Sequence, residues 1–331
     1  MTKTLIAGLG SIGRRHLRNL VALGETDIVL LRTHRSTLPE DDLAGYPVET
    51  DLRAALRRHS PEAVIVANPT ALHLDVAIPA ARAGCAILLE KPISNSMKGL
   101  RRLEAAVGKC GANVLVAFQF RFHPSLLAAR KLIADGAIGR IISAEVHYGE
   151  YLPGWHPWED YRNGYAARAD LGGGVVLTQC HSLDYLPWLA GPVESAWGLV
   201  GKLSDLEVDV DDTAKIGLRF ASGALGSLHL DYNQQPPSHS LMVVGTQGSL
   251  KCDMADGTVN LYRADSTAWE SYPLPPGWER NLMFMEEMKH FLEVARGEAE
   301  PACTLADGIR VMRLIEAVMK SQRTGRMVSV D

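Results

Sequence analysis

The chain has 331 residues, of which 47% are hydrophobic and 22% charged, and its formal net charge is −4. This length predicts two domains, and the charge gives no electrostatic reason to expect nucleic acid or a membrane surface as a partner. No apolar run reaches the roughly 20 residues of a spanning helix, and the N-terminus lacks the layout of a signal peptide.

Cysteine usage points to a cytoplasmic protein. The five cysteines, Cys85, Cys110, Cys180, Cys252 and Cys303, are far apart and form no C-x-x-C pair. Such spacing favours free, buried thiols in a reducing compartment over disulfides or a zinc site. We therefore expect no bound metal.

Residues 1–120 alternate strand-like and helix-like segments. The apolar runs KTLIAG, DIVLLR, EAVIVAN, CAILLE and NVLVAF are typical of strands that are covered on both faces. Helical patterns lie between them at 12–23, 51–58, 72–83 and 97–109, and the short basic clusters RRH and LRRH are expected to be solvated helix faces. Repeated βα units predict a doubly wound parallel sheet with right-handed crossovers.

Residues 121–331 follow a different pattern. A helix-like segment, PSLLAARKLIADG, is followed by several strand-like runs that are separated by turn residues and not by helices. This arrangement favours antiparallel pairing in a second domain. The segment LGGGVVLTQCHSLDYLPWLAG is expected to form a helix laid against that sheet, and two further helices end the chain.

A glycine pattern, Gly8-x-Gly10-x-x-Gly13, follows the first predicted strand and opens the first predicted helix. Glycines permit a tight turn and let the backbone approach a pyrophosphate, whose charge a helix N-terminus favours. We therefore expect this turn, with Ser11 and Ile12, to bind a dinucleotide. The alternative is a tight turn that binds nothing.

The stretch LLRTHRST, after the second predicted strand, indicates which dinucleotide is bound. An acid for the ribose hydroxyls is expected about 20 residues beyond the glycines, and Arg32 stands there instead. Arg32, Thr33, Arg35 and Ser36 can bond a 2′-phosphate, which a carboxylate would repel. The expected cofactor is NAD(P), with a preference for NADP; alternatively, Arg32 packs against the adenine and both forms are accepted.

A third signature, EKPISNS, follows the fifth predicted strand. Adjacent residues of a strand point to opposite faces, so at most one of Glu90 and Lys91 enters a ligand cleft. Ligands in such sheets bind at the carboxyl ends of the strands, which places Lys91 near the nicotinamide. A surface lysine before a turn proline is the alternative.

Three segments carry a resemblance to a known family: GLGSIGRRH, VIVANPTALHLDVAIPAARAGCAILLEKPIS and GGGVVLTQCHSLDYLPWLAG. Over nearly its whole length the chain resembles the glucose–fructose oxidoreductase/inositol dehydrogenase family (Gfo/Idh/MocA). The resemblance implies a Rossmann domain over 1–120 and an α+β domain with a large open, mainly antiparallel sheet over 121–331, whose C-terminal helix can pack back on the first domain. It also implies a homodimer or homotetramer formed through the outer face of that sheet.

The resemblance carries site residues over by position. Lys91 matches the catalytic lysine of the family, in which the bond to the following proline is commonly cis. The segment NPTALH matches the part of the family that borders the nicotinamide. The cofactor-binding residues implied in these two segments are Asn68, Pro69, His73, Glu90, Lys91 and Pro92.

His181 matches the catalytic histidine of the family, and Asp184 follows at the usual interval. Many relatives carry an aspartate four residues before the histidine, where this chain has Leu177. Leucine can neither share the substrate hydroxyl nor orient the imidazole. Either His181 works with Lys91 alone, or the substrate supplies its own contact, or catalysis is lost.

The expected chemistry moves a hydride between a carbinol carbon and the nicotinamide while the hydroxyl proton leaves to a base. An imidazole titrates near the working pH, so His181 is assigned as that base. Lys91 is assigned as the electrostatic partner of the substrate oxygen. The opposite assignment, with Lys91 as the base and His181 as the partner of the oxygen, stays open.

Substrate contacts are expected from two stretches. FQFRFHP lies at the junction of the expected domains, where ligand clefts form, and YLPGWHPWEDYRNGYAARADLGGG is a loop of a length that is usually functional. Their rings suit a sugar, and their arginines hint at an acidic or nucleotide-linked one. The expected contacts are Gln119, Arg121, His123, Trp155, Trp158, Tyr161, Arg162, Tyr165 and Arg168, together with His181 and Asp184.

The sequence therefore predicts an NAD(P)-dependent dehydrogenase or reductase. Its substrate is expected to be a sugar, sugar acid, inositol or sugar nucleotide that reacts at a CH–OH group. Two alternatives stay open: an NAD-dependent glycosidase of the same family, and a catalytically idle nucleotide-binding protein.

Overall fold

The computed structural model describes residues 1–33 and 43–330, which form two compact units. The first unit comprises residues 1–119 and 280–309, and the second comprises residues 120–279 and those from 310 onward. Residues 280–309 therefore belong to the first unit, although they follow the second in sequence. Each unit is described by itself.

The first unit contains a six-stranded sheet with the order β3-β2-β1-β4-β5-β6. All of its neighbouring strands pair in parallel, and the order runs outward from β1 in both directions, which confirms the predicted doubly wound Rossmann sheet. Five of the strands match the predicted apolar runs, whereas the two-residue β3 was not predicted. The strands are β1 (Thr4–Ala7), β2 (Ile28–Leu31), β3 (Val48–Glu49), β4 (Ala63–Val66), β5 (Ala86–Glu90) and β6 (Val114–Ala117).

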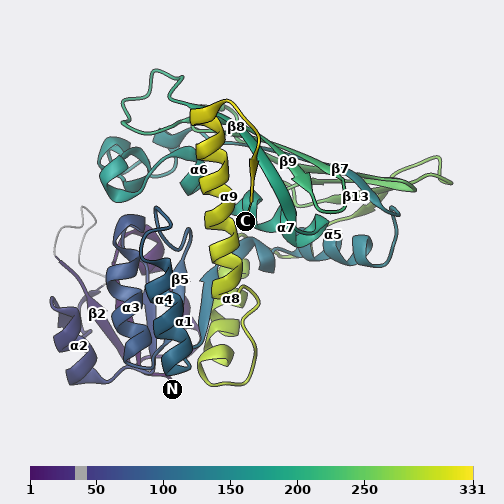
Figure 1. Ribbon diagram of the computed structural model, residues 1–331. Coiled ribbons are helices and arrows are strands. Elements are labelled where there is room, and N and C mark those ends of the chain that lie inside the picture. Colours follow the sequence, from purple (N-terminus) through teal and green to yellow (C-terminus); the bar gives the residue numbers. More distant parts are fainter. Residues whose placement is uncertain (34–42, 331) are drawn as a thin grey trace. The chain divides into compact units, whose positions relative to one another are not determined.

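Helices cover this sheet, and their ends follow local sequence signals. Asp51 caps α2 by accepting a hydrogen bond from the Ala54 N–H, and α4 ends at Gly111, whose φ of +65° suits glycine. Helix α3 packs against α4 and β5, beside which Figure 1 draws it, while α1 packs against α8. The helices are α1 (Ser11–Ala22), α2 (Leu52–His59), α3 (His73–Arg82), α4 (Leu100–Cys110) and α8 (Asn281–Ala295).

The second unit contains a nine-stranded sheet with the order β14-β13-β12-β11-β7-β10-β9-β8-β15, part of which is drawn in blue-green to green in Figure 1. Its pairs are antiparallel except β7 with β10, which confirms the predicted mainly antiparallel sheet. The strands are β7 (Ile141–Gly149), β8 (Val193–Gly201), β9 (Thr213–Phe220), β10 (Leu225–Asp231), β11 (Ser238–Gly245), β12 (Gly248–Asp253), β13 (Val259–Arg263), β14 (Glu270–Tyr272) and β15 (Val328–Ser329).

One face of this sheet is covered and the other is open. Burial alternates along the strands, so that Val146 and Leu228 are buried while Glu145 and Ser227 beside them are exposed. The helices that contact the sheet are α5 (Pro124–Ala134), α6 (Val175–Thr178), α7 (His181–Ala190) and the C-terminal part of α9 (Leu305–Thr324). Within the described residues, no helix is both long and apolar enough to cross a membrane.

The segment predicted as one helix before residue 191 is two helices, α6 and α7. The Thr178 hydroxyl donates to the Gly174 carbonyl, a local bond that competes with regular helix geometry. Gln179 then takes a non-helical end conformation, and its side-chain amide donates to the Asp231 carbonyl at 3.1 Å. The break makes His181 the first residue of a new helix.

All five cysteines are free, as predicted, but Cys110 is exposed, so the prediction of burial was wrong for this residue. Cys110 is the last residue of α4. Burial raises the pKa of Cys85 to about 11 and that of Cys252 to about 12, so both stay as neutral thiols.

The glycine turn supplies a test of packing. A Cβ at Gly13 would overlap the carbonyl oxygen of Gly8, whereas a Cβ at Gly10 would meet open space. Gly13→Ala should therefore lower the free energy of unfolding by about 1–3 kcal/mol, the usual cost of overpacking. Gly10→Ala is the matched control and should unfold at the wild-type urea concentration. Equal midpoints for the two variants would contradict the packing argument.

Candidate functional site

The N-terminus of α1 has the features of an anion-binding turn. Gly10 is its N-cap and brings no side chain, and the first turn contains no acidic residue, with Ser11 and Ile12 as its first two positions. The helix thus presents backbone N–H groups and the positive end of its dipole. Gly8, at a φ of +94°, lies so close to β4 that a Cβ would come within 2.5 Å of the Asn68 nitrogen. These residues fit a pyrophosphate.

The basic cluster RRH on α1 is not a solvated face, which corrects the prediction for two of its residues. Arg14 is buried and donates through Nε to the Leu9 carbonyl at 3.0 Å. His16 is fully buried, and its Nε2 lies 2.7 Å from Glu90 Oε1 at the end of β5. Because residues two positions apart lie on nearly opposite sides of a helix, α1 is buried on more than one side. The second cluster, LRRH, exposes Arg57 and Arg58 as predicted.

Glu90 is an anchor for the turn that follows it. Burial alone would raise the pKa of Glu90, but the hydrogen bond to His16 and the charges of His16, Lys91 and His73 outweigh it, and the pKa is lowered. The second oxygen of Glu90 accepts the Lys91 backbone N–H at 3.2 Å. Lys91 is half-buried, and the Lys91–Pro92 bond is cis. The carboxylate therefore holds the backbone from which the Lys91 side chain projects.

His73 joins the two loops that follow β4 and β5. Its Nδ1 lies 2.9 Å from the Pro92 carbonyl oxygen, and its Nε2 lies 2.9 Å from that of Asn68. Burial lowers the pKa of His73, although Glu90 and both carbonyl contacts oppose the shift. With both nitrogens against the backbone, the imidazole fixes the positions of Asn68 and Pro92 relative to each other. Pro69 precedes the short 3-10 turn that leads into α3.

Glu287 on α8 is a second buried carboxyl group in this region. Its side chain is 1% exposed, and neither oxygen has a hydrogen-bond partner in the described part of the chain. Burial raises the pKa of Glu287 well above its usual range, the charge of Glu90 adds to this, and that of Lys91 opposes it. The group is therefore a neutral acid where Glu90 is a carboxylate.

The residues after β2 are described only in part. Arg32 is buried directly after the strand, and its backbone N–H donates to the Glu49 carbonyl at 3.0 Å. Thr33 is exposed. Arg35 and Ser36, the other residues expected to bind a 2′-phosphate, lie outside the described residues.

In the second unit, α7 carries His181 and Asp184 in its first turn. Asp184 forms a two-point ion pair with Arg121, whose Nε and Nη2 donate at 2.9 and 2.6 Å, and both side chains are buried. The ring of Phe120 packs edge-on against the His181 imidazole, with centroids 4.9 Å apart. The ion pair and the ring fix the turn on which His181 lies.

The residues around this turn also have structural contacts. His123 caps α5 by accepting the Ser125 N–H, and its ring packs against Trp278. Leu177 is half-buried on α6. In the first unit, Gln119 is buried.

The long loop is folded into four 3-10 turns: Leu152–Gly154, Tyr161–Asn163, Tyr165–Ala167 and Ala169–Leu171. Its arginines pair with carboxylates: Arg162 with Asp160 and Glu207, and Arg168 with Asp170. The loop aromatics differ in exposure, because Trp158 is 67% exposed while Trp155 packs on Tyr232. Tyr161 accepts the Glu207 N–H, and Tyr165 is half-buried.

Two residues of the first unit were missed by the sequence analysis, His16 and Glu287. His16 lies on the sequence face of α1 that includes Gly13, Leu17 and Leu20, a signal that could have marked it as inward. Glu287 lies on the same face of α8 as the buried Met283, Phe284 and Phe291, but the tertiary position of that helix has no local signal.

The buried acid Glu287 predicts a pH-dependent difference in stability. Its raised pKa means that the unfolded chain ionises first, so its contribution is fully present below the unfolded value near 4.3 and is lost as pH rises towards the folded pKa. Glu287→Gln removes this loss. The variant should gain stability relative to wild type between pH 5 and pH 8, as measured by urea unfolding at both values. Glu286→Gln, an exposed neighbour, is the control. A pH-independent difference would contradict the prediction.

Known proteins share both the fold and the sequence pattern. A family described as "Oxidoreductase family, NAD-binding Rossmann fold" matches residues 2–118, and the "GFO/IDH/MocA C-terminal domain" matches residues 126–251. The 1,5-anhydro-D-fructose reductase of Ensifer adhaerens is 27% identical over 82% of this chain and 80% of its own. The D-xylose 1-dehydrogenase (NADP(+)) 2 of Haloferax volcanii is 23% identical over 98% of this chain and 99% of its own.

A solved structure has the same fold along the whole chain. Levoglucosan dehydrogenase in complex with NADH superposes with a TM-score of 0.87, at 23% identity, over 99% of this chain and 98% of its own. The glycine turn, the Lys91–Pro92 turn and the two family domains agree with the predicted resemblance. The chain belongs to the Gfo/Idh/MocA family of oxidoreductases and has an NAD-binding Rossmann domain.

Proposed function

We propose that this oxidoreductase acts on a CH–OH carbon of a neutral sugar or related polyol, with Lys91 and His181 as its catalytic residues. The observation that carries the proposal is the anchored Lys91: Glu90, itself fixed by His16, holds its backbone N–H at 3.2 Å. The names of the relatives, which include a reductase and a dehydrogenase of sugars, support the substrate class.

The bound nicotinamide would supply the acceptor or donor of the hydride. The α1 turn and the loops tied together by His73 would hold this cofactor, with contacts from Asn68, Pro69 and Pro92. Lys91 would place its ammonium group against the substrate oxygen and stabilise the negative charge that grows there.

His181 would take the hydroxyl proton. It is the first residue of α7, and the positive end of a helix dipole favours the neutral imidazole that a base requires. The nearby carboxylate of Asp184 would oppose this effect, but its charge is matched by the Arg121 guanidinium. We therefore propose Arg121 and Asp184 as positioning residues, a role that does not require contact with the substrate.

The long loop supports a neutral substrate over an acidic one. Both Arg162 and Arg168 are already paired with carboxylates, so little positive charge is left for an anion. The rings of Trp155, Trp158, Tyr161 and Tyr165 offer the faces on which sugars stack, and we propose them as substrate contacts together with Gln119.

Replacement of either catalytic residue tests the assignment. Lys91→Ala and His181→Ala should each lower kcat by about 10²–10⁴-fold, the usual contribution of one acid–base or charge-stabilising group. The substrate is first found by following nicotinamide absorbance across neutral sugars, inositols, sugar acids and sugar nucleotides. Lys98→Ala, a change of an exposed lysine, is the control. A kcat near the wild-type value in either variant would refute that residue's role.

We also propose that the enzyme prefers NADP, because a buried arginine stands after β2 where an acid would bind the ribose. Arg32→Asp should raise the Kd of NADP much more than that of NAD, since the 2′-phosphate loses a cation and meets a carboxylate. Arg53→Asp, the same change at an exposed site of α2, should alter neither Kd. Fluorescence titration of both cofactors measures the difference, and equal shifts for the two cofactors would exclude phosphate recognition by Arg32.

We further propose a cytoplasmic homo-oligomer that associates through the open sheet face. Four of the five thiols are buried and none forms a disulfide within the described residues, which suits a reducing compartment. Leu199 on β8 and Leu225 on β10 are each more than half exposed, and a second copy of the chain would cover them. The charge of −4 gives no support to a nucleic-acid partner.

A further inference from the structure

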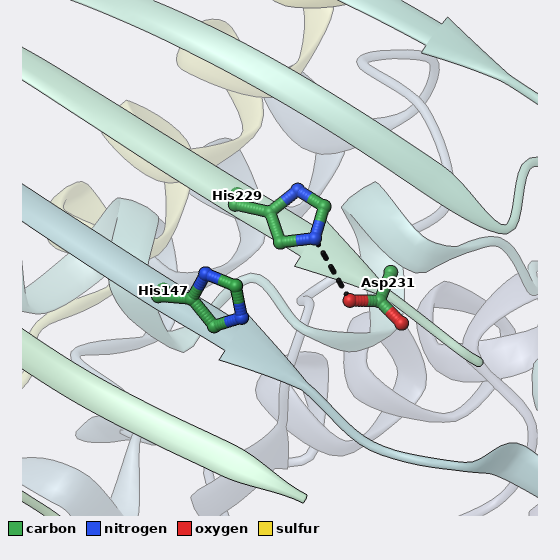
Figure 2. Close-up of side chains that lie close together, drawn as sticks. All are labelled: His147, His229 and Asp231. Carbon is green, nitrogen blue, oxygen red and sulfur yellow. Dashed lines mark ion pairs between the residues drawn. The ribbon is translucent and has the colours of Figure 1, made fainter. Parts of the chain in front are cut away.

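A cluster of three metal-ligating side chains lies on the second sheet, outside the site described above. His147 comes from β7, and His229 and Asp231 come from β10 (Figure 2). One ligand atom of each residue lies within 4.8 Å of the others. We propose that these three residues bind a divalent transition-metal ion, with zinc as the reference ion.

The strand register brings the three residues together. β7 and β10 form the parallel pair of this sheet, and His147 and His229 are direct partners across it. Asp231 follows His229 by two residues and therefore points to the same face. The intervening Leu230 and the flanking Val146 and Tyr148 are buried on the opposite face, so the cluster does not belong to the apolar core.

The donor set suits zinc and its neighbours among the first-row metals. Two imidazole nitrogens and one carboxylate oxygen are common ligands for such ions, which bind them at about 2.0–2.2 Å. Ligand atoms in a tetrahedral site therefore lie about 3.4 Å apart. His229 Nε2 and Asp231 Oδ2 are 2.9 Å apart, and the ligand atoms of the cluster all lie within 4.8 Å of one another, so their separations are close to those of a tetrahedral site.

Surrounding groups orient the ligands, as outer-shell groups do in metal sites. Asp231 Oδ1 accepts the backbone N–H groups of Asn233 and Gln234 at 2.7 and 2.6 Å, which leaves Oδ2 directed at His229. The two backbone contacts of Asp231 reduce the ordering that an ion would have to impose. The side-chain oxygen of Gln234 lies 2.5 Å from His147 Nε2, so an ion bound at this nitrogen would replace that contact.

The His229 nitrogen that would bind the ion is Nε2, which lies 2.9 Å from Asp231 Oδ2 and faces the cluster in Figure 2. The other nitrogen, Nδ1, is buried on the far side of the ring and has no hydrogen-bond partner among the residues that the structure describes. The His147 and His229 rings lie close, with centroids 4.6 Å apart, so one ion can reach a nitrogen of each ring.

Zinc binding to the full-length chain tests the proposal. The protein is stripped with a chelator and titrated with zinc chloride against a chromophoric competitor. The Cys110→Ser background is used because that thiol is exposed. We expect one tight site per chain and a rise in the unfolding temperature on zinc addition. His147→Ala and Asp231→Asn should each weaken binding by more than the 10–100-fold that loss of an outer-shell partner typically causes.

Glu145→Gln is the matched control, because this exposed carboxylate stands on β7 two residues before His147. It should keep the wild-type affinity. The structural reference for every variant is its unfolding temperature without zinc, which separates loss of the site from loss of the fold. Failure of the wild type to bind zinc, or unchanged affinity in the His147 and Asp231 variants, would overturn the proposal whatever the enzyme's activity.

Discussion

The hydrogen bond between His16 and Glu90 joins the glycine turn to the Lys91 turn. The two residues are 74 positions apart, and both are buried, so neither has water as an alternative partner. Loss of one member of such a pair costs about 1–3 kcal/mol, because the other is left as a buried polar group without its hydrogen-bond partner. Helix α1 starts at the glycines, and Glu90 holds the N–H of Lys91. One buried contact thus sets the glycine turn and the Lys91 turn relative to each other.

The same part of the unit keeps two carboxyl groups in different states. Glu90 has cationic neighbours and a hydrogen-bond partner that overcome the effect of burial on its pKa. Glu287 is equally buried, but it meets the negative charge of Glu90 and has no hydrogen-bond partner within the described residues. One charged and one neutral acid leave Lys91 beside a single full negative charge. Environment, and not residue type, sets the charge around the lysine.

Much of the fold could be predicted from the sequence, because its signals are local. All-apolar runs separated by helical patterns determine a doubly wound sheet, and runs without helices between them determine an antiparallel one. The two-residue strand β3 has too few residues to show a pattern. The break between α6 and α7 depends on contacts with β10, and the placement of residues 280–309 in the first unit depends on tertiary packing. Neither the helix break nor this placement can be predicted from a local stretch of sequence.

The candidate site divides in the same way. Gly8, Gly10, Gly13 and Lys91 stand in sequence motifs whose spacing marks them as candidate site residues. The partners of Arg121, Asp184 and His73 depend instead on which side chains meet in space, and the sequence could not show that these groups bind each other or the backbone. The wrong prediction that RRH is a solvated face has the same origin. The sequence of a helix does not show that a buried acid, here Glu90, contacts one of its basic residues.

Asp231 has contacts on both sides of the second sheet. Its side chain belongs to the cluster with His147 and His229, while its backbone carbonyl accepts the Gln179 amide just before α7. The next residue, Tyr232, is hydrogen-bonded through its hydroxyl to Thr178. An ion that fixes the Asp231 carboxylate would also fix the strand end on which the start of α7 rests. His181 is the first residue of that helix. A metal on the open face of the sheet would therefore restrict the motion of the turn that carries the proposed base, without touching the substrate.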